Sequence, residues 1–432
     1  MRRAMEIEKT FTRLLELNGE WRIVEVSFKE AEKRFVIEVE ETGALWSGES
    51  LRQGGSVSCY DHVGPLRWRH LNVFNCECDI ECRLPRGKRA DGRVYRVTPP
   101  WEGKNKHFTK EFEAFALALM REMPVSRAGE ILGEGDMRMW SMVHRHVDAA
   151  RPQVSMAKVR AVGADEMSRA KGHRYVTVFA DMEERKVLFA TPGRDSATWT
   201  EFGRDLASHG GDTAKIEEIS MDMSPAYMKG AAEQCPQASI VFDKFHVVAH
   251  ANEAVNKVRK LELKRGAAGN REQVEGTRWL FRKNPENWSD GDWERYDRID
   301  LESLRTGQAY SMRLSLQDIY QKATGVIAAR RRFKLWISWV RRASTRAKDG
   351  LLMPMRRLAD MVESHLDGIV AHWKRKTTNA FMEGLNSVFS AVKRKARGYR
   401  TEFYLINMLY FVASKLPIPM ATYGGRPLQV AH

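Results

Sequence analysis

Short apolar runs alternate with helical stretches between residues 174 and 246, and no other feature of the sequence constrains the fold as strongly. The runs RYVTVFAD, KVLFATPG, IEEISMD and ASIVFDKFH read as strands, while TWTEFGRDLASHG and PAYMKGAAEQC have helical patterns. Strands that alternate with helices indicate an α/β fold class. We therefore predict an α/β core that begins in 170–250, continues through a basic and mostly α-helical insertion in 251–372, and ends in helices in 373–432.

Two acidic residues end strands of this predicted core. Asp181 ends YVTVFAD, and Asp222 ends IEEISMD. A carboxylate at the end of a buried strand is costly unless it is paired or binds a cation, and neighbouring strands lie only about 4.8 Å apart. Carboxylates on neighbouring strands could therefore chelate the same ions, and oxygen ligands select Mg²⁺ or Mn²⁺. The competing interpretation is that each acid is a solvent-facing turn residue.

Two smaller units are predicted before the α/β core. Residues 1–98 are rich in strand patterns, such as the alternation of Val24, Val26 and Phe28. Residues 99–160 turn helical, and MPVSRAGEILGEGDMRMWSMVHRHVDAA predicts a short helix, a glycine-containing break and a longer helix. This is the outline of a helix-turn-helix, although helix pairs with tight turns are common in any helical protein. The candidate DNA contacts in this unit are Arg127, Arg138 and Arg145.

The charge balance indicates the kind of partner. The formal net charge of +15 favours a polyanion, with nucleic acid first and an anionic membrane surface second. The sequence contains no run of about 18 apolar residues, so we expect no membrane span, and its start lacks the apolar segment of a signal peptide. Five cysteines are too few for a secreted disulfide scaffold. We expect a reducing cytoplasm, in association with the nucleoid.

Four segments, in order, resemble insertion-sequence transposases of the ISL-three group. They are VTVFADMEERKVLFATPGRD, SMDMSPAY, FDKFHVVAHANEAVNKVR and TTNAFMEGLNSVFSAVKRKARGYR, and the resemblance extends from about residue 20 to residue 417. Members of this group carry a DDE catalytic domain of the ribonuclease-H-like class with a mostly helical insertion. The resemblance implies that Asp181, Asp222 and Glu383 are the catalytic acids and hold two Mg²⁺ or Mn²⁺ ions.

The resemblance also implies roles for residues near these acids. Asp243 and His246 look like the Asp-x-x-His signature that follows the second acid, so His246 would orient a scissile phosphate, unless it only packs at a helix start. Asn379, in the block around Glu383, would support the active site. A tryptophan of the insertion would stack on a flipped base, with core packing as the alternative. The basic block would hold phosphates of the cleaved strand. The candidates are Trp279, Trp288 and Trp293 for stacking, and Lys393, Arg394, Lys395, Arg397 and Arg400 for phosphates.

The N-terminal module departs from the family pattern, which is a β-rich, zinc-ribbon-like unit. No Cys-x-x-Cys precedes YDHVGPLRWRHLN, and GKRADG stands where the second ligand pair is expected. Cys76, Cys78 and Cys82 alternate along one predicted strand, which places Cys76 and Cys82 about 20 Å apart at about 3.3 Å per residue. They cannot share one ion in that conformation, so we interpret them as small buried hydrophobes. We do not expect structural zinc, and the module can keep its fold without its ligands.

Together these observations predict a transposase that binds double-stranded DNA at the terminal inverted repeats of an insertion sequence. It would hydrolyse a phosphodiester at each end and join the freed 3′-hydroxyl to target DNA. Because two ends must be brought together, we expect a homodimer or a higher oligomer. Two alternatives remain open: a DNA-binding regulator without catalysis, and a structure-specific ribonuclease-H-like nuclease.

Overall fold

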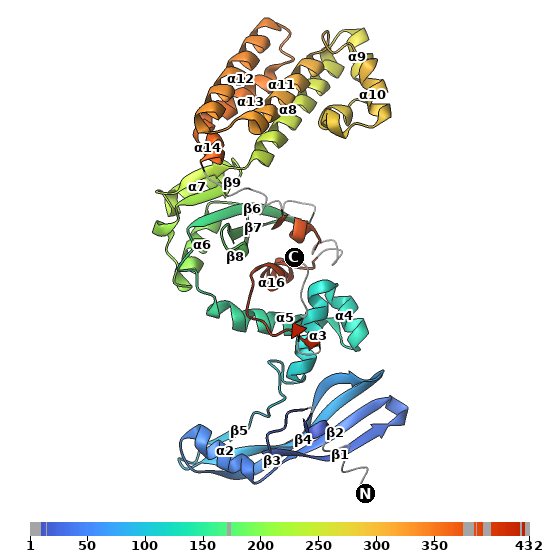
Figure 1. The fold of residues 1–432 in the computed structure, drawn as a ribbon, viewed down its shortest axis with the longest axis vertical. Coiled ribbons are helices and arrows are strands. Elements are labelled where there is room, and N and C mark those ends of the chain that lie inside the picture. Colours follow the sequence, from blue (N-terminus) through green and yellow to red (C-terminus); the bar gives the residue numbers. More distant parts are fainter. Residues whose placement is uncertain are drawn as a thin grey trace. The chain divides into compact units, whose positions relative to one another are not determined.

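The computed structural model describes residues 10–13, 15–170, 174–374, 384–385, 387–391, 399–423 and 426–427. The chain divides into two compact units, whose elements are drawn in Figure 1. The described residues of unit 1 fall within Met1–Gln153 and Leu416–His432, and those of unit 2 within Val154–Arg394 and Gly398–Lys415. Among the described residues, no helix is both long and apolar enough to cross a membrane.

Unit 1 begins with a five-stranded sheet, and the residues around Val24, Val26 and Phe28 form a strand, as their alternation predicts. Its elements are β1 (Trp21–Lys29), β2 (Arg34–Glu41), α2 (Ala44–Gln53), β3 (Val57–Val73), β4 (Cys76–Arg89) and β5 (Val94–Arg96). β2 is antiparallel to β1 and parallel to β4, and β4 is antiparallel to both β3 and β5. The core of this sheet buries Trp21, Ile37, Trp68, Ile80 and Leu84.

The cysteines of β4 are packing residues. Cys78 and Cys82 are buried, and burial raises the pKa of both thiols to about 12. Because β4 is continuous from its first residue, Cys76 and Cys82 lie about 20 Å apart at about 3.3 Å per residue. The strand predicted for these cysteines is confirmed, and Cys78 and Cys82 fill the sheet core as small apolar side chains.

Three helices follow the sheet in unit 1. They are α3 (Lys110–Glu122), α4 (Val125–Leu132) and α5 (Asp136–Ala150). The Thr109 side chain caps α3 by accepting the Phe112 N–H at 3.2 Å. Gly133 ends α4 with a φ of +71°, a left-handed conformation that glycine adopts without steric cost. The predicted short helix, glycine break and longer helix are therefore confirmed.

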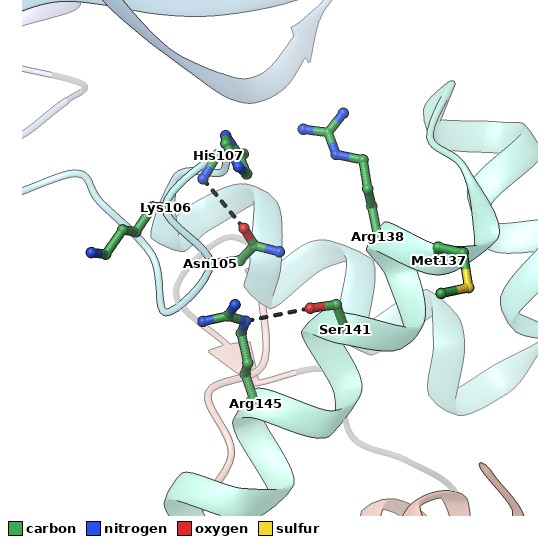
Figure 2. A pocket seen from close by; sticks show the side chains of 7 residues that line it. All are labelled: Asn105, Lys106, His107, Met137, Arg138, Ser141 and Arg145. Atoms are coloured by element: carbon green, nitrogen blue, oxygen red, sulfur yellow. Dashed lines mark hydrogen bonds between the residues drawn. The ribbon is translucent and has the colours of Figure 1, made fainter.

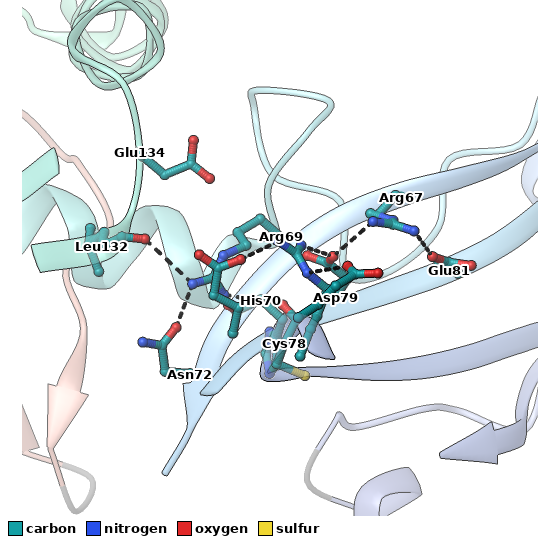
Figure 3. Close-up of polar contacts among 12 residues, drawn as sticks. Arg67, Arg69, His70, Asn72, Cys78, Asp79, Glu81, Leu132 and Glu134 are labelled. Atoms are coloured by element: carbon teal, nitrogen blue, oxygen red, sulfur yellow. Dashed lines mark hydrogen bonds and ion pairs between the residues drawn. The ribbon is translucent and has the colours of Figure 1, made fainter. Parts of the chain in front are cut away.

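A buried arginine ties the sheet of unit 1 to these helices. The Arg69 guanidinium donates to the carbonyl oxygens of His70 and Cys78 within the sheet. It also donates to the Asn72 side chain and, at 3.5 Å, to the carbonyl oxygen of Leu132 at the end of α4 (Figure 3). Burial lowers the pKa of Arg69, and the acidic side chains around it oppose that shift. The sheet and the helix-turn-helix therefore share one hydrogen-bonded brace.

Unit 2 is built around a five-stranded sheet with the order β10-β9-β6-β7-β8. The strands are β6 (Ala161–Ala170), β7 (Arg174–Asp181), β8 (Lys186–Pro192), β9 (Glu218–Met221) and β10 (Ser239–Phe242). β6, β7 and β8 form an antiparallel meander, while β9 lies parallel to β6 and β10 lies parallel to β9. The sequence predicts four of these strands. It does not predict β6, which is the central strand.

Helices cover this sheet. They are α6 (Ala197–Ser208), α7 (Pro225–Gln234) and α16 (Glu402–Ala413). Phe179 of β7 stacks on Phe202 of α6 with ring centroids 4.3 Å apart, and it meets Trp199 edge-on at 4.9 Å. The Tyr410 hydroxyl of α16 accepts the Ala190 N–H of β8 at 3.0 Å. Aromatic packing and this hydrogen bond fix α6 and α16 on the sheet.

The stretch after β10 is helical, as the sequence predicts. Its helices are α8 (Lys244–Arg265), α9 (Ala268–Val274), α10 (Asp290–Asp297), α11 (Arg305–Lys322), α12 (Val326–Arg346), α13 (Met353–Ser364) and α14 (Leu366–Val370). α8, α11, α12 and α13 pack together (Figure 1). Glu262, buried on α8, accepts the N–H groups of Arg305 and Thr306 at 2.9 and 2.7 Å. It thereby satisfies donors at the start of α11 that lack partners within the helix.

Candidate functional site

Asp165, near the middle of β6, and Asp222, the residue that follows β9, come together on one side of the sheet. These strands are parallel, and Gly163 of β6 lies beside Ser220 of β9. Continued by two residues, this register sets Asp165 beside Asp222, on strands about 4.8 Å apart. Both acids are half-buried. We call the part of the sheet around Asp165 and Asp222 the acidic edge. It can offer two carboxylates to one cation.

Asp181 lies toward the opposite end of the strands, near the start of β6. It is the last residue of β7, which runs antiparallel to β6, and it pairs with Val162 near the start of β6. That position is about 10 Å along the strand from the acidic edge, and β6 also separates β7 from β9. The Asp181 carboxylate accepts the N–H groups of Glu183 and Glu184 at 2.9 and 3.0 Å, which closes a turn. The prediction that Asp181 and Asp222 share one metal site is therefore wrong, because their strands end at opposite edges.

Several charged side chains at the acidic edge affect the pKa of Glu166. Burial raises the pKa of the Glu166 carboxyl, and the negative charges of Asp222 and Asp165 raise it further. Arg194 and His246 oppose this shift. Acids and cations from four segments of the chain thus act on one another at this edge, and two of them, Asp222 and His246, are predicted from the sequence.

The two residues of the predicted Asp-x-x-His signature occupy different environments. Asp243 begins α8 as its N-cap, and its carboxylate accepts the Phe245 N–H at 2.8 Å. His246 lies in the first turn of the same helix, near His250. Burial lowers the pKa of His250, His246 lowers it further, and Asp222 raises it. The first two turns of α8 therefore carry two histidines, one in each turn, and Asp243 starts the helix that positions them.

The donor set of the acidic edge fits a hard divalent cation, because it consists of carboxylate oxygens. Among the residues that the structure describes, one group of three metal-binding side chains has donor atoms within 4.8 Å of one another: Glu41, Cys59 and His62 of unit 1. There His62 Nε2 and Glu41 Oε1 are 2.6 Å apart. Among the described residues, the acids of the acidic edge do not form such a group. The predicted third acid, Glu383, and its neighbour Asn379 lie outside the described residues.

Two of the three candidate tryptophans pack against each other. Trp288 is 9% exposed, and its indole N–H donates to the carbonyl oxygen of Leu280 at 3.3 Å. Its ring lies nearly parallel to that of Tyr310. Trp293 meets Trp288 edge-on with ring centroids 4.8 Å apart. Trp288 is thus a core residue and is not available to stack on a base.

Trp279 has the opposite character. It is 63% exposed, which makes it the most exposed tryptophan among the described residues. The guanidinium carbons of Arg278 and Arg282 lie 5.2 and 5.6 Å from its ring centroid. An exposed aromatic ring beside two cations suits a stacked nucleobase with nearby phosphates.

The predicted basic contacts fall partly within the described residues. Arg138 and Arg145 are exposed on α5, and Arg400 is exposed before α16. Arg127 is exposed on α4, where it pairs with Glu130 at 2.6 Å. The four other basic candidates lie outside the described residues: Lys393, Arg394, Lys395 and Arg397.

Sequence reasoning missed four residues of the acidic edge: Asp165, Glu166, Arg194 and His250. The segment VGADEMSRA has too short an apolar run and too many charges to be recognised as a strand by alternation. A usable signal was present, because the small apolar run VGA ends in Asp-Glu just before a predicted strand. An antiparallel partner for that strand would have been a natural expectation.

Comparisons with known proteins agree with these features. A family model of ISL3 transposases of the DDE type, described as "Transposase", matches residues 162–409. A second model, "Helix-turn-helix domain of transposase family ISL3", matches residues 97–147. The chain is 27% identical over 356 residues to the transposase for insertion sequence element IS1001 of Bordetella parapertussis, covering 78% of this chain and 82% of that protein. It is 26% identical over 386 residues to the transposase for insertion sequence element IS1557 of Mycobacterium tuberculosis, covering 82% of this chain and 83% of that protein.

Proposed function

Because the chain belongs to the ISL3 family of insertion-sequence transposases, we propose that it binds the terminal inverted repeats of an insertion sequence, hydrolyses a phosphodiester at each end and joins the freed 3′-hydroxyl to target DNA. The observation that carries this proposal is the register that sets Asp165 beside Asp222, within the range matched by the transposase family. Metal ions held by neighbouring carboxylates can stabilise both the attacking and the leaving oxygen in phosphoryl transfer.

We assign Asp165 as the first catalytic acid in place of Asp181, with Asp222 as the second, and we keep Glu383 as the third. These side chains would hold Mg²⁺ or Mn²⁺, as two ions. When bound, such ions activate a water or a 3′-hydroxyl and stabilise the leaving oxygen. The contribution of the protein is to carry Asp165 on β6 and Asp222 directly after β9, because the backbone hydrogen bonds between these two strands fix their spacing.

The basic side chains of the acidic edge would bind the substrate. Arg194 and His246 lie close enough to Glu166 to affect its titration, so they would also feel the charge of a phosphate bound there. We infer that they hold non-bridging oxygens of the scissile phosphate by charge-assisted hydrogen bonds. Asp243 would act through His246 by capping α8, and Asn379 would support the same site from the segment that carries Glu383.

The strand order supports a ribonuclease-H-like fold for unit 2. An antiparallel meander of three strands is extended on the side of β6 by the parallel strands β9 and β10, and the helical insertion follows β10. In the same way, we propose that the sheet of unit 1 is a zinc-ribbon-like module that keeps its fold through an apolar core in place of the family's metal ligands.

DNA contacts outside the acidic edge would come from two places. In unit 1, the helix-turn-helix would read the inverted repeat through α5, with Arg127, Arg138 and Arg145 as basic contacts. In unit 2, Trp279 would stack on a base near the transposon end, and Arg400 would join the neighbouring basic block on the cleaved strand. The working complex would be a homodimer or a higher oligomer, because it holds two ends, and it would act in the cytoplasm on nucleoid DNA.

The other two functions are less well supported. A regulator without catalysis would have no need for Asp165 and Asp222 in register. A structure-specific nuclease would have no need for a helix-turn-helix that recognises one duplex sequence.

The decisive experiment is cleavage of a labelled duplex that carries the element's own terminal repeat, in Mg²⁺ or Mn²⁺ and then in EDTA. We expect metal-dependent cutting at the repeat boundary. A duplex with a scrambled repeat is the matched control and should remain intact. Tight, sequence-specific binding without cutting in any metal would support the regulator, and equal cutting of RNA–DNA hybrids and junctions would support the nuclease.

A further inference from the structure

A pocket of about 470 Å³ lies between the loop before α3 and the exposed face of α5 (Figure 2). Arg138, Ser141 and Arg145 follow one another at helical spacing, so they share the face of α5 that borders the pocket. Lys106 and His107 approach from the loop. The full lining consists of Asn105, Lys106, His107, Met137, Arg138, Ser141 and Arg145.

The pocket presents one sign of charge. Among the described residues, its lining includes the cations Lys106, Arg138 and Arg145, but no aspartate or glutamate. Arg138 pairs with Glu134, at 2.6 Å. Within the part of the chain that the structure describes, Lys106 and Arg145 have no carboxylate partner, and Arg145 donates to the Ser141 hydroxyl at 3.3 Å. Two cations without counter-ions around one recess favour an anionic ligand.

The loop side of the pocket is held in place by a buried, hydrogen-bonded pair of side chains. The Glu113 carboxylate of α3 accepts the backbone N–H groups of Lys104 and Asn105 at 2.9 and 2.6 Å. His146 of α5 contacts the same carboxylate at 2.8 Å, and both side chains are only 2% exposed. The loop and α5 are therefore anchored to one buried group. The separation of Lys106 from Arg145 is set before any ligand binds, which reduces the ordering cost of binding.

We propose that this pocket holds a backbone phosphate of duplex DNA, an inference that rests on the proposed DNA-binding function of the helix-turn-helix. The second helix of such a motif enters the major groove with its N-terminal residues against the bases, and backbone phosphates border that groove. Lys106 from the loop and Arg145 from α5 would bind oxygens of one such phosphate. Because phosphate contacts fix register and orientation but carry no sequence information, the pocket sets how deeply α5 docks.

The test compares two lysines of the same loop. Affinity of the full chain is measured for a terminal-repeat duplex and for a random duplex of equal length, across a series of salt concentrations. We expect Lys106→Ala and Arg145→Ala each to weaken binding of both duplexes by a similar factor, on the order of tenfold, and to lower the salt slope by about 1. Lys104 has the same charge and exposure but does not line the pocket, so Lys104→Ala should match wild type.

Each outcome decides the inference. If Lys106→Ala and Lys104→Ala bind DNA with equal affinity while wild type still binds the repeat, the pocket does not hold a phosphate. That result would leave the proposed function intact. A loss confined to the repeat duplex would also overturn it, since that result assigns Lys106 and Arg145 to base readout. If wild type binds neither duplex, the proposed function and this inference both fail.

Discussion

The acidic edge of unit 2 and the basic pocket of unit 1 are both polar sites, but they are built in different ways. The acidic edge takes its geometry from strand register, which, continued by two residues, sets Asp165 of β6 beside Asp222, the residue after β9. The pocket takes its geometry from a loop and a helix that share the buried Glu113–His146 pair. Strand register sets the spacing of the acidic residues. The hydrogen-bonded loop of unit 1 sets the position of the basic residues around the pocket.

This difference determines how each site should respond to mutation. A site that shares ions between carboxylates depends on the identity of each ligand, so loss of one acid should abolish the chemistry. A site that holds phosphates sums the contributions of several cations, so loss of one should weaken binding by degrees. The following predictions test that contrast, from the largest expected effect to the smallest.

The first prediction concerns the acids. Asp165→Asn and Asp222→Asn should each lower cleavage by at least about 10³-fold, because loss of an ion ligand costs several kcal/mol of transition-state stabilisation. Binding of the terminal repeat should be retained. Asp181→Asn is the matched control: it can still accept the turn N–H groups, so cleavage should stay near wild type. If Asp181→Asn is as inactive as Asp222→Asn while Asp165→Asn cleaves, the acidic edge has been assigned to the wrong strand.

The second prediction concerns the brace within unit 1. Arg69→Met should destabilise unit 1 by about 1–3 kcal/mol for each buried carbonyl oxygen that loses its donor. Hydrogen exchange should show peptides of β3 and α4 losing protection together. Arg22→Met, at a pair that is 68% and 43% exposed, should cost no more than about 1 kcal/mol. Loss of protection in β3 alone would mean that the sheet does not support the helix-turn-helix.

The third prediction asks whether DNA contacts extend into the helical insertion. Trp279→Ala should weaken binding of a transposon end by about 1–3 kcal/mol, the usual contribution of one stacked base. Trp279→Phe should restore part of this loss, and thermal stability should not change, because the side chain is mostly exposed. Trp293→Ala serves as the comparison, since Trp293 packs on Trp288. Equal effects of Trp279→Ala and Trp293→Ala on end binding would remove the case for stacking.

The fourth and smallest effect is a pH dependence of unit 1. Burial lowers the pKa of His70, and its Nδ1 lies 2.9 Å from the hydroxyl of Thr109, the cap of α3. Since the folded state favours neutral His70, its contribution is present above the unfolded pKa of about 6.5 and is lost as the pH falls through the lower folded value. The melting temperature of unit 1 should therefore fall on acidification, and less so in His70→Asn. An identical pH profile in that variant would assign the titration to another group.

Much of the fold could be predicted from the sequence, because local patterns carry it. The alternating residues of β1, β2, β7 and β8 form strands, and the glycine at position 133 separates two helices as expected. Asp222 and His246 lie where strand ends and a helix start were expected to bring them. The exception is β6, whose apolar run is short and whose charges hide the alternation, so the strand at the centre of the sheet was not recognised.

The exposure of the tryptophan side chains could not be predicted from the sequence either. Trp279 and Trp288 stand nine residues apart in equally polar surroundings, yet the Trp279 ring is exposed near two arginines and the Trp288 ring lies in the core. Composition does not distinguish them, because burial depends on segments distant in the chain, here the Tyr310 of α11.

By itself, the sequence determined the kind of protein: an α/β core with acids at strand ends, a helical insertion, a helix-turn-helix and a positive charge suited to DNA. Only the tertiary structure decided which acids meet. Asp181 and Asp165 both follow short apolar runs, and nothing local distinguishes them. The direction of each strand does, because parallel neighbours bring their carboxyl ends to the same edge while antiparallel neighbours send them to opposite edges. Strand direction depends on the pairing of distant segments, so it is a property of the whole sheet.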